Sequence, residues 1–98
     1  DVVMITKTKK NELVWLEKGD EIVGLQHIIT RHSNNFKEAF GVNKEQIPSF
    51  IKSVIDNGRL VSSRKNGMKI TTIYDYGGKH YVLCAVGANG FIVTVYPR

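Results

Sequence analysis

Residues 68–86 read MKITTIYDYGGKHYVLCAV and carry a clear pattern of strands and a turn. Apolar and polar side chains alternate on both sides of Gly77-Gly78, a pair that suits a two-residue turn because both glycines can adopt positive φ. The stretch therefore predicts two antiparallel strands, Met68–Tyr76 and Lys79–Val86. The second strand is apolar on both faces, as expected for the centre of a sheet.

Similar runs flank this hairpin on both sides. Arg59–Ser63 precedes it, with Asn66-Gly67 between, and Phe91–Tyr96 follows it, with Asn89-Gly90 between. Each connecting pair is a tight-turn signal, so the runs predict an antiparallel meander of about four strands.

Helical patterns come before the meander. Asp20 is available as the N-cap of a first helix, which should end near Ser33-Asn34-Asn35. The apolar positions of that helix recur at helical spacing and are Ile22, Leu25, Ile28 and Ile29. A second helix includes Pro48–Asn57, because proline fits a first helical turn and Asn57-Gly58 fits a stop. The order predicts an α+β domain, with N-terminal helices packed on a roughly four-stranded antiparallel sheet.

The start of the chain is open to two interpretations. Val2–Thr6 and Leu13–Leu16 are short apolar runs that could be strands or the end of an interdomain linker. The chain starts at Asp1 rather than Met, which suggests the C-terminal fragment of a larger protein. Its 98 residues suffice for one domain, residues 1–98, with a modest core. The sequence contains no signal peptide and no apolar run of membrane-spanning length.

The chain has one cysteine, Cys84, so no internal disulfide can form. Cys84 lies in the apolar run Tyr81–Val86 and is expected to be a small buried side chain. A nucleophilic pair with His80 is the alternative, and it is disfavoured because an alternating strand would bury the thiol.

The charge balance narrows the class of partner. The chain has 14 Lys and Arg residues against 9 Asp and Glu residues, a formal net charge of +5. A small basic domain suits a polyanion such as nucleic acid, because binding releases counterions from the phosphates. The same charge equally suits an acidic protein or an anionic membrane surface.

Alternation in the last strand predicts one open face of the sheet. Phe91, Val93 and Val95 form the better core face. Thr94 and Tyr96 then point to the other side.

The preceding strand Met68–Tyr76 carries a similar polar side. Its alternation places Lys69 and Thr71 together, on the side opposite Ile70. Ile73 interrupts the pattern, so either Thr71 or Thr72 is expected on the open face.

Residues 24–32 read GLQHIITRH and carry the groups best suited to chemistry. His27 and Arg31 are four residues apart and share a helix face, whereas His32 falls within the apolar arc. Cleavage of RNA at the 2′-hydroxyl needs a base, an acid and cations that stabilise the phosphate. Histidine can exchange protons near neutral pH, and arginine matches phosphate geometry. His27 and Arg31 could therefore fill two of these roles.

A metal site is disfavoured by the same segment. His27 and His32 are five apart and are expected to diverge, whereas zinc-binding helices space histidines four apart. No acidic residue follows Glu21 within the predicted helix, and no second cysteine completes a site. We therefore expect no metal and no other cofactor.

Three features occur together in this chain: Trp15, the run Gly24-Leu25-x-His27-Ile28-x-x-Arg31-His32, and the ending Thr94-Val95-Tyr96-Pro97. In this combination the chain resembles the barnase/EndoU/colicin/RelE group of nucleases. The nearer resemblance is to phage-associated members and to the C-terminal toxin domains of contact-dependent growth inhibition and polymorphic toxin proteins. It covers most of the chain, from about Trp15 to Tyr96.

The resemblance implies a two-layer α+β fold and metal-independent RNA cleavage that leaves a 2′,3′-cyclic phosphate, often on tRNA. It implies an active site on the sheet face, with residues from the N-terminal helix and later strands. The matching positions are His27, Arg31, Thr94 and Tyr96, followed by His32, Lys69 and Thr71. The glutamate base of barnase has no counterpart, because Asp75 is the only acid in residues 68–96. This departure shifts the role of base to His27.

The resemblance also implies partners and a place of action. Toxins of this group are secreted or delivered from the surface of the producing cell and act in the cytoplasm of the target cell. The producing cell then needs a neutralising immunity protein, and the basic charge of this chain predicts an acidic one. The cations expected to hold the RNA backbone are Lys7, Lys9, Lys10, Arg59, Arg64 and Lys65.

Three other functions fit the same composition. A non-catalytic RNA- or DNA-binding domain would use Tyr74, Tyr76 and Tyr81 as stacking platforms. A protein-interaction module would present its basic face to an acidic partner. A DNase usually needs a divalent metal, and the scarcity of acidic ligands disfavours it.

Overall fold

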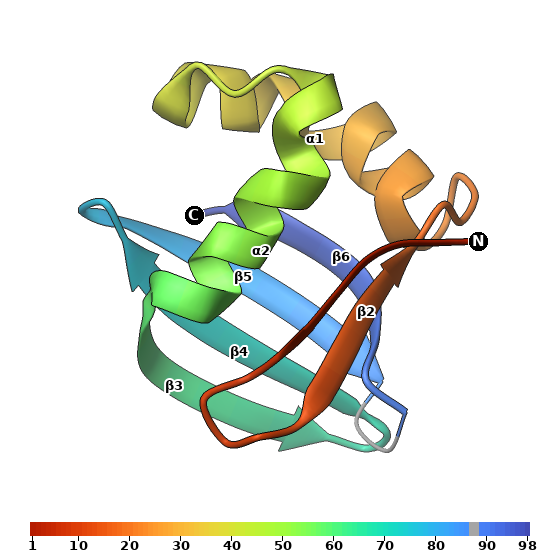
Figure 1. Ribbon diagram of the computed structural model, residues 1–98, viewed down its shortest axis with the longest axis vertical. Coiled ribbons are helices and arrows are strands. Elements are labelled where there is room, and N and C mark those ends of the chain that lie inside the picture. The colour runs from red at the N-terminus through yellow and green to blue at the C-terminus, as the bar shows by residue number, and fades with distance from the viewer. Residues whose placement is uncertain (87–88) are drawn as a thin grey trace.

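The computed structural model describes residues 1–86 and 89–98, without the side chains of Phe40 and Val86. The elements of this part of the chain are, in order, β1 (Val2–Lys7), β2 (Leu13–Glu17), α1 (Gly24–Phe40), a 3₁₀ turn (Lys44–Gln46), α2 (Ile47–Asn57), β3 (Arg59–Asn66), β4 (Lys69–Tyr76), β5 (Lys79–Val86) and β6 (Phe91–Pro97) (Figure 1).

The fold is α+β, as predicted, but the sheet is larger and the element order differs. The described residues form a six-stranded mixed sheet in the order β1-β2-β6-β5-β4-β3. The prediction of about four strands preceded by N-terminal helices is wrong, because β1 and β2 come first and join the sheet. They pair with each other, and β2 joins β6 through one parallel bridge between Trp15 and Phe91.

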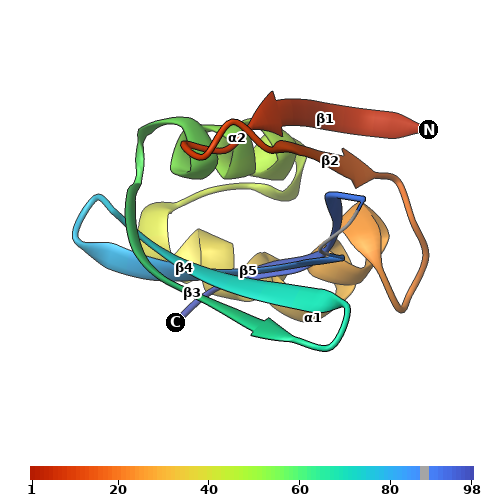
Figure 2. The ribbon, with the colours of Figure 1, turned by 90° about the horizontal axis from the view of Figure 1, so that it is seen from below.

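The core lies between two parts of a strongly curved sheet. Figure 2 shows α2, β1 and β2 on one side of the core and β4 and β5 on the other. Helix α1 packs against β6, and α2 packs against β1 and β4. The largest fully buried side chains are Leu16, Ile28, Phe36, Ile47, Ile51, Ile55, Tyr81 and Ile92. Leu16 is among them, which explains why the first apolar runs are strands rather than a linker.

Helix α1 begins later and ends later than predicted. The carboxylate of Asp20 accepts hydrogen bonds from the backbone N–H groups of Ile22 and Val23, in the turn before the helix. Ile22 is 75% exposed and takes no part in the core. The helix continues through 33–35, because Phe36 is 1% exposed and anchors the next turn in the core. Burial of this ring outweighs the weak helix propensity of the two asparagines.

Helix α2 confirms its prediction. It begins at Ile47, with Pro48 in its first turn, and ends at Asn57 before Gly58. Ile51, Val54 and Ile55 are buried.

The central hairpin also confirms its prediction. Strand β5 spans Lys79–Val86, and the turn glycines Gly77 and Gly78 have φ of 60° and 80°. In β4, Thr72 and Tyr74 are buried on the core side, so Thr71 is the threonine on the other side.

Strand β6 departs from simple alternation. The pairing with β5 shifts between Cys84 and Ala85, which turns Ile92 into the core at 0% exposure. The predicted core face of Phe91 and Val93 is therefore wrong, because an extra residue at a bulge reverses the faces. Strand β6 begins at Phe91, directly after the predicted turn pair Asn89-Gly90, and residues 87–88 before that pair lie outside the described residues.

A surface contact ties α2 to β1 and is expected to depend on pH. Hydrogen bonds from Lys52 and Thr6 lower the pKa of Asp56 below its ordinary value of 3.8. A lowered folded-state pKa adds stability above pH 3.8, and this stability is lost as the pH falls through the folded-state pKa. Asp56→Asn should therefore reduce the free energy of unfolding by at most about 1 kcal/mol at neutral pH.

Urea denaturation at neutral pH and well below pH 3.8 measures this effect. The difference between Asp56→Asn and the parent protein should vanish at the acidic pH. Glu38→Gln, the same change at an exposed helix position, is the control. An undiminished difference in acid would show that the Asp56 charge is not its source.

Candidate functional site

One side of the sheet carries the polar residues that the sequence placed there. Arg64, Thr71, Cys84 and Thr94 are successive cross-strand partners through β3, β4, β5 and β6. Tyr96 lies on the same side of β6, because side chains two residues apart share a face. We call this side, defined by these residues together with Lys69, the open face. Lys69 and Arg64 are exposed, and Thr71, Cys84 and Tyr96 are half-buried.

Three rings connect α1 to the open face. The ring of His32 stacks on that of Tyr96, with centroids 5.0 Å apart and planes 25° apart. The ring of His27 meets that of His32 edge-on, with centroids 5.7 Å apart and planes 78° apart. The expectation that His27 and His32 diverge is wrong. A helical wheel gives only the directions in which side chains leave the helix, whereas the two rings are long enough to meet. We call His27, His32 and Tyr96 the ring cluster.

His27 is held in one tautomer by the chain that precedes α1. Its Nδ1 lies 3.0 Å from the carbonyl oxygen of Glu21. A carbonyl oxygen can only accept, so Nδ1 carries the proton and donates it. Nε2 is then the nitrogen that can exchange a proton with a ligand.

Gly24 allows the start of α1 to lie close to the end of β2. Its φ is 82°, and a Cβ at this position would lie 2.8 Å from the carbonyl oxygen of Glu17. A side chain would push the start of α1 away from the end of β2. Gly24 thus sets the position of the helical turn that carries His27.

His32 is the more enclosed histidine. Burial lowers the pKa of His32 below its ordinary value of 6.5, and the charges of His27 and Arg31 lower it further. Its Nδ1 is buried and has no hydrogen-bond partner among the described residues. A proton on that atom would have no acceptor, which, like the lowered pKa, favours the neutral form of the ring.

Arg31 and Thr94 differ in their exposure to solvent. Arg31 is exposed, and its charge contributes to the lowered pKa of His32, so a cation lies within electrostatic range of the ring cluster. Thr94 lies on the open face, but its hydroxyl oxygen is buried and has no partner among residues 1–86 and 89–98. This hydroxyl can reach a phosphate only if neighbouring side chains move.

The predicted substrate-binding residues divide between the two sides of the sheet. The hydroxyl of Thr71 lies 4.0 Å from Cys84 Sγ, near the middle of the open face. Arg64 pairs with Thr71, whereas Lys65 pairs with Ile70 and so lies on the opposite side of β3. Lys69 and Arg64 therefore accompany the ring cluster on one side, and Lys65 does not.

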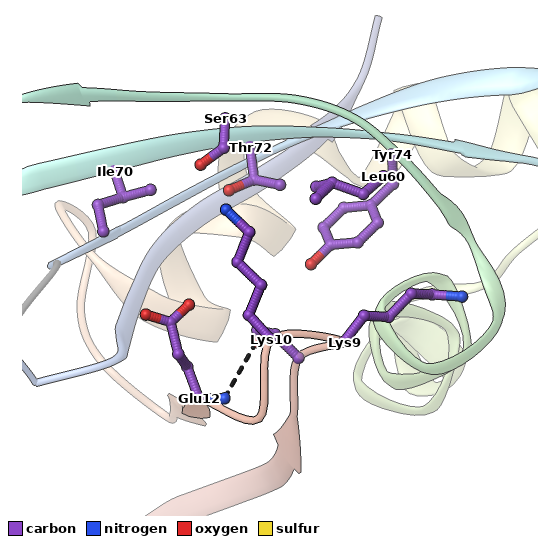
Figure 3. Close-up of a pocket in the computed structure, with 9 residues that line it drawn as sticks. Lys9, Lys10, Glu12, Leu60, Ser63, Ile70, Thr72 and Tyr74 are labelled. Carbon is purple, nitrogen blue, oxygen red and sulfur yellow. Dashed lines mark hydrogen bonds between the residues drawn. The ribbon is translucent and has the colours of Figure 1, made fainter.

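The core side holds a separate hollow (Figure 3). A cavity of about 120 Å³ lies between the loop that joins β1 to β2 and the strands β3 and β4. Lys10 points into it toward Thr72 and Ser63. Burial and the charge of Glu12 raise the pKa of Tyr74, which also lines it. Lys10 is exposed, and its side chain extends over this hollow.

The sequence offered no signal for this cavity, because a loop and a distant hairpin form it together. None of its lining residues is a histidine or arginine. His27, His32 and Arg31 therefore lie outside this cavity. Among the described residues, no group of three or more His, Cys, Asp or Glu side chains is placed to hold a metal ion.

Two of the stacking platforms of the non-catalytic alternative are inaccessible. Tyr74 is 3% exposed and Tyr81 is 0% exposed, because both rings pack in the core. Tyr76 is half-buried and packs against Phe50. Tyr74 and Tyr81 therefore do not offer faces for unpaired bases.

Comparison with protein-family models and with curated proteins finds no match for this chain. The resemblance to the nuclease group thus remains a prediction. Within the described residues, no helix has the length and apolar character needed to cross a membrane.

Proposed function

We propose that this domain is a metal-independent endoribonuclease that cleaves RNA, with tRNA as the favoured substrate. The 2′-oxygen loses its proton to a base and bonds to the adjacent phosphorus, and the bond from phosphorus to the 5′-oxygen breaks. The products are a 2′,3′-cyclic phosphate and a 5′-hydroxyl end, which takes its proton from an acid. The observation that carries the proposal is the ring cluster, in which His27 has Nδ1 bound to a carbonyl oxygen and Nε2 left for proton exchange. Arg31, beside it, is a cation of the kind that stabilises a phosphate transition state.

The members of the ring cluster take different roles in this proposal. His27 exchanges a proton with the RNA as general base or acid. His32 is neutral, so it adds no positive charge next to His27, and its ring fixes the orientation of the His27 ring. Tyr96 supports His32 from β6 and presents its hydroxyl on the open face. Lys69 and Arg64 hold the RNA backbone on the same side of the sheet.

The proposed biology follows from the charge and the resemblance. An acidic immunity protein covers the open face and neutralises the domain, because its charge complements the net charge of +5. The domain is delivered from the producing cell and acts in the cytoplasm of the target cell.

Incubation of the purified domain with total cellular RNA in excess EDTA tests the proposal directly. Denaturing gels should show discrete RNA fragments, and the fragments should end in cyclic phosphate. Intact RNA under conditions where the domain still binds it would leave a non-catalytic binding domain as the better account. Cleavage that stops in EDTA would exclude the metal-independent mechanism.

Two substitutions of His32 separate positioning from proton transfer. His32→Phe keeps a flat ring against Tyr96, whereas His32→Ala removes the ring. We expect His32→Ala to lose on the order of 100-fold in cleavage rate, the effect of misplacing a reacting group by about 1 Å. His32→Phe should recover most of that loss. If both variants fold and are equally inactive, His32 itself exchanges the proton.

A further inference from the structure

Trp15 and Phe91 form a pair of aromatic rings away from the ring cluster. They are direct cross-strand partners at the single bridge between β2 and β6, and their ring centroids lie 6.5 Å apart. Both side chains are half-buried, whereas Val14 and Leu16 take the core side of β2. Neither ring is part of the hydrophobic core cluster of the described residues.

Core packing does not account for large rings at these two positions. Ile5 pairs with Trp15 and is 51% exposed, and Leu13, two residues away on the same side of β2, is 48% exposed. The indole N–H of Trp15 donates to the carboxylate of Glu17 at 2.9 Å, which satisfies the polar edge and holds the ring in place. Two oriented aromatic rings are thus partly open to solvent.

The register connects this pair to the open face. Lys69 and Phe91 are both partners of position 86 on β5, so Trp15, Phe91 and Lys69 share one row across the sheet. Phe91 is at the start of β6 and Tyr96 is near its end. Because the pairing of β6 with β5 shifts between them, Thr94 and Tyr96 lie on the same side of the sheet as Phe91. At about 3.3 Å per residue, the two ends are roughly 16 Å apart along the strand.

Two basic side chains lie on the same side of the sheet as the aromatic pair. Lys69 lies in its row, and Lys7 pairs with Leu13 on the neighbouring strand. Both ammonium groups are on exposed side chains. Aromatic faces with nearby cations are the usual combination for holding unpaired nucleotides, because bases stack on the rings while cations follow the backbone.

We propose that Trp15 and Phe91 form a base-stacking subsite for an unpaired nucleotide of the RNA strand that reaches His27. The inference rests on the proposed ribonuclease function and specifies its substrate as single-stranded or looped RNA. Bases within a duplex are stacked on one another and cannot lie on these rings. The subsite contributes affinity and sets the length of unpaired RNA that the domain needs.

Fluorescence tests this inference without relying on cleavage, because Trp15 is the only tryptophan of the chain. The probe is a single-stranded RNA oligonucleotide with 2′-O-methyl groups, which cannot be cleaved by attack of the 2′-oxygen. Its binding should quench the emission of Trp15, and a fully paired RNA duplex should not. Phe91→Leu should weaken binding at least about fivefold, the lower end of the range for one base stacked on one ring.

Ile5→Ala is the matched control, because it removes an exposed apolar side chain next to Trp15 without removing a ring. It should leave the affinity for the oligonucleotide unchanged. Unchanged Trp15 emission at saturating oligonucleotide, or equal weakening by Ile5→Ala and Phe91→Leu, would overturn the inference even if the domain cleaves RNA. Specific quenching without any cleavage would support the subsite and refute the proposed ribonuclease.

Discussion

Replacing His27 with asparagine is expected to lower the rate of RNA cleavage about 100- to 10,000-fold, the contribution of one positioned acid or base. The asparagine amide can still donate to the Glu21 carbonyl, which His27 Nδ1 contacts at 3.0 Å. It has no counterpart of Nε2, so the substitution removes proton exchange and keeps the hydrogen bond. Initial rates on the RNA substrate in EDTA measure the loss, and circular dichroism checks the fold.

His80→Asn is the matched control for this prediction. His80 is exposed on β5 and pairs with Asp75, outside the ring cluster. The same chemical change at His80 should leave the cleavage rate within about twofold of the parent, as expected for a group with no part in the transition state. A folded His27→Asn variant that cleaves at the parent rate would remove His27 from the mechanism.

Replacing Phe36 with alanine is expected to cost about 3–5 kcal/mol of stability, the usual effect of deleting a buried phenyl ring. Phe36 is 1% exposed, and its ring centroid lies 6.3 Å from that of Tyr81 and 6.0 Å from that of Phe50. Through this ring α1 contacts both Phe50 of α2 and Tyr81 of β5. A domain of this size has a total stability of about 5–15 kcal/mol, so the variant should be close to unfolding at room temperature.

The free energy of unfolding in urea measures this effect. Phe36→Leu keeps most of the buried volume and should lose clearly less stability than Phe36→Ala. Lys37→Ala, at the exposed neighbouring position, should change stability by no more than about 0.5 kcal/mol. If Phe36→Ala were as stable as Lys37→Ala, the end of α1 could not be anchored in the core as the structure has it.

Patterns contained within a short segment were predictable from the sequence. Gly77-Gly78 and the alternation around it specify the hairpin of β4 and β5, because turn geometry and side-chain direction are local properties. Pro48 and the apolar stripe behind it specify α2 for the same reason. The common helix face of His27 and Arg31 was predictable because residues four apart on a helix are neighbours, and both lie on α1.

Features that depend on distant partners were not predictable in this way. The length of α1 depends on Phe36, whose burial requires Tyr81 and Phe50 from other elements. The core position of Ile92 depends on how β6 pairs with β5, since a bulge changes which side each residue faces.

The candidate site shows the same division. The sequence by itself determined which residues can exchange protons or bind phosphate, because those properties belong to the side chains. Tertiary packing, by contrast, places His32 between His27 and Tyr96 and buries the hydroxyl oxygen of Thr94. Each of these depends on packing between segments far apart in the chain, where burial and distance rather than local spacing set the outcome.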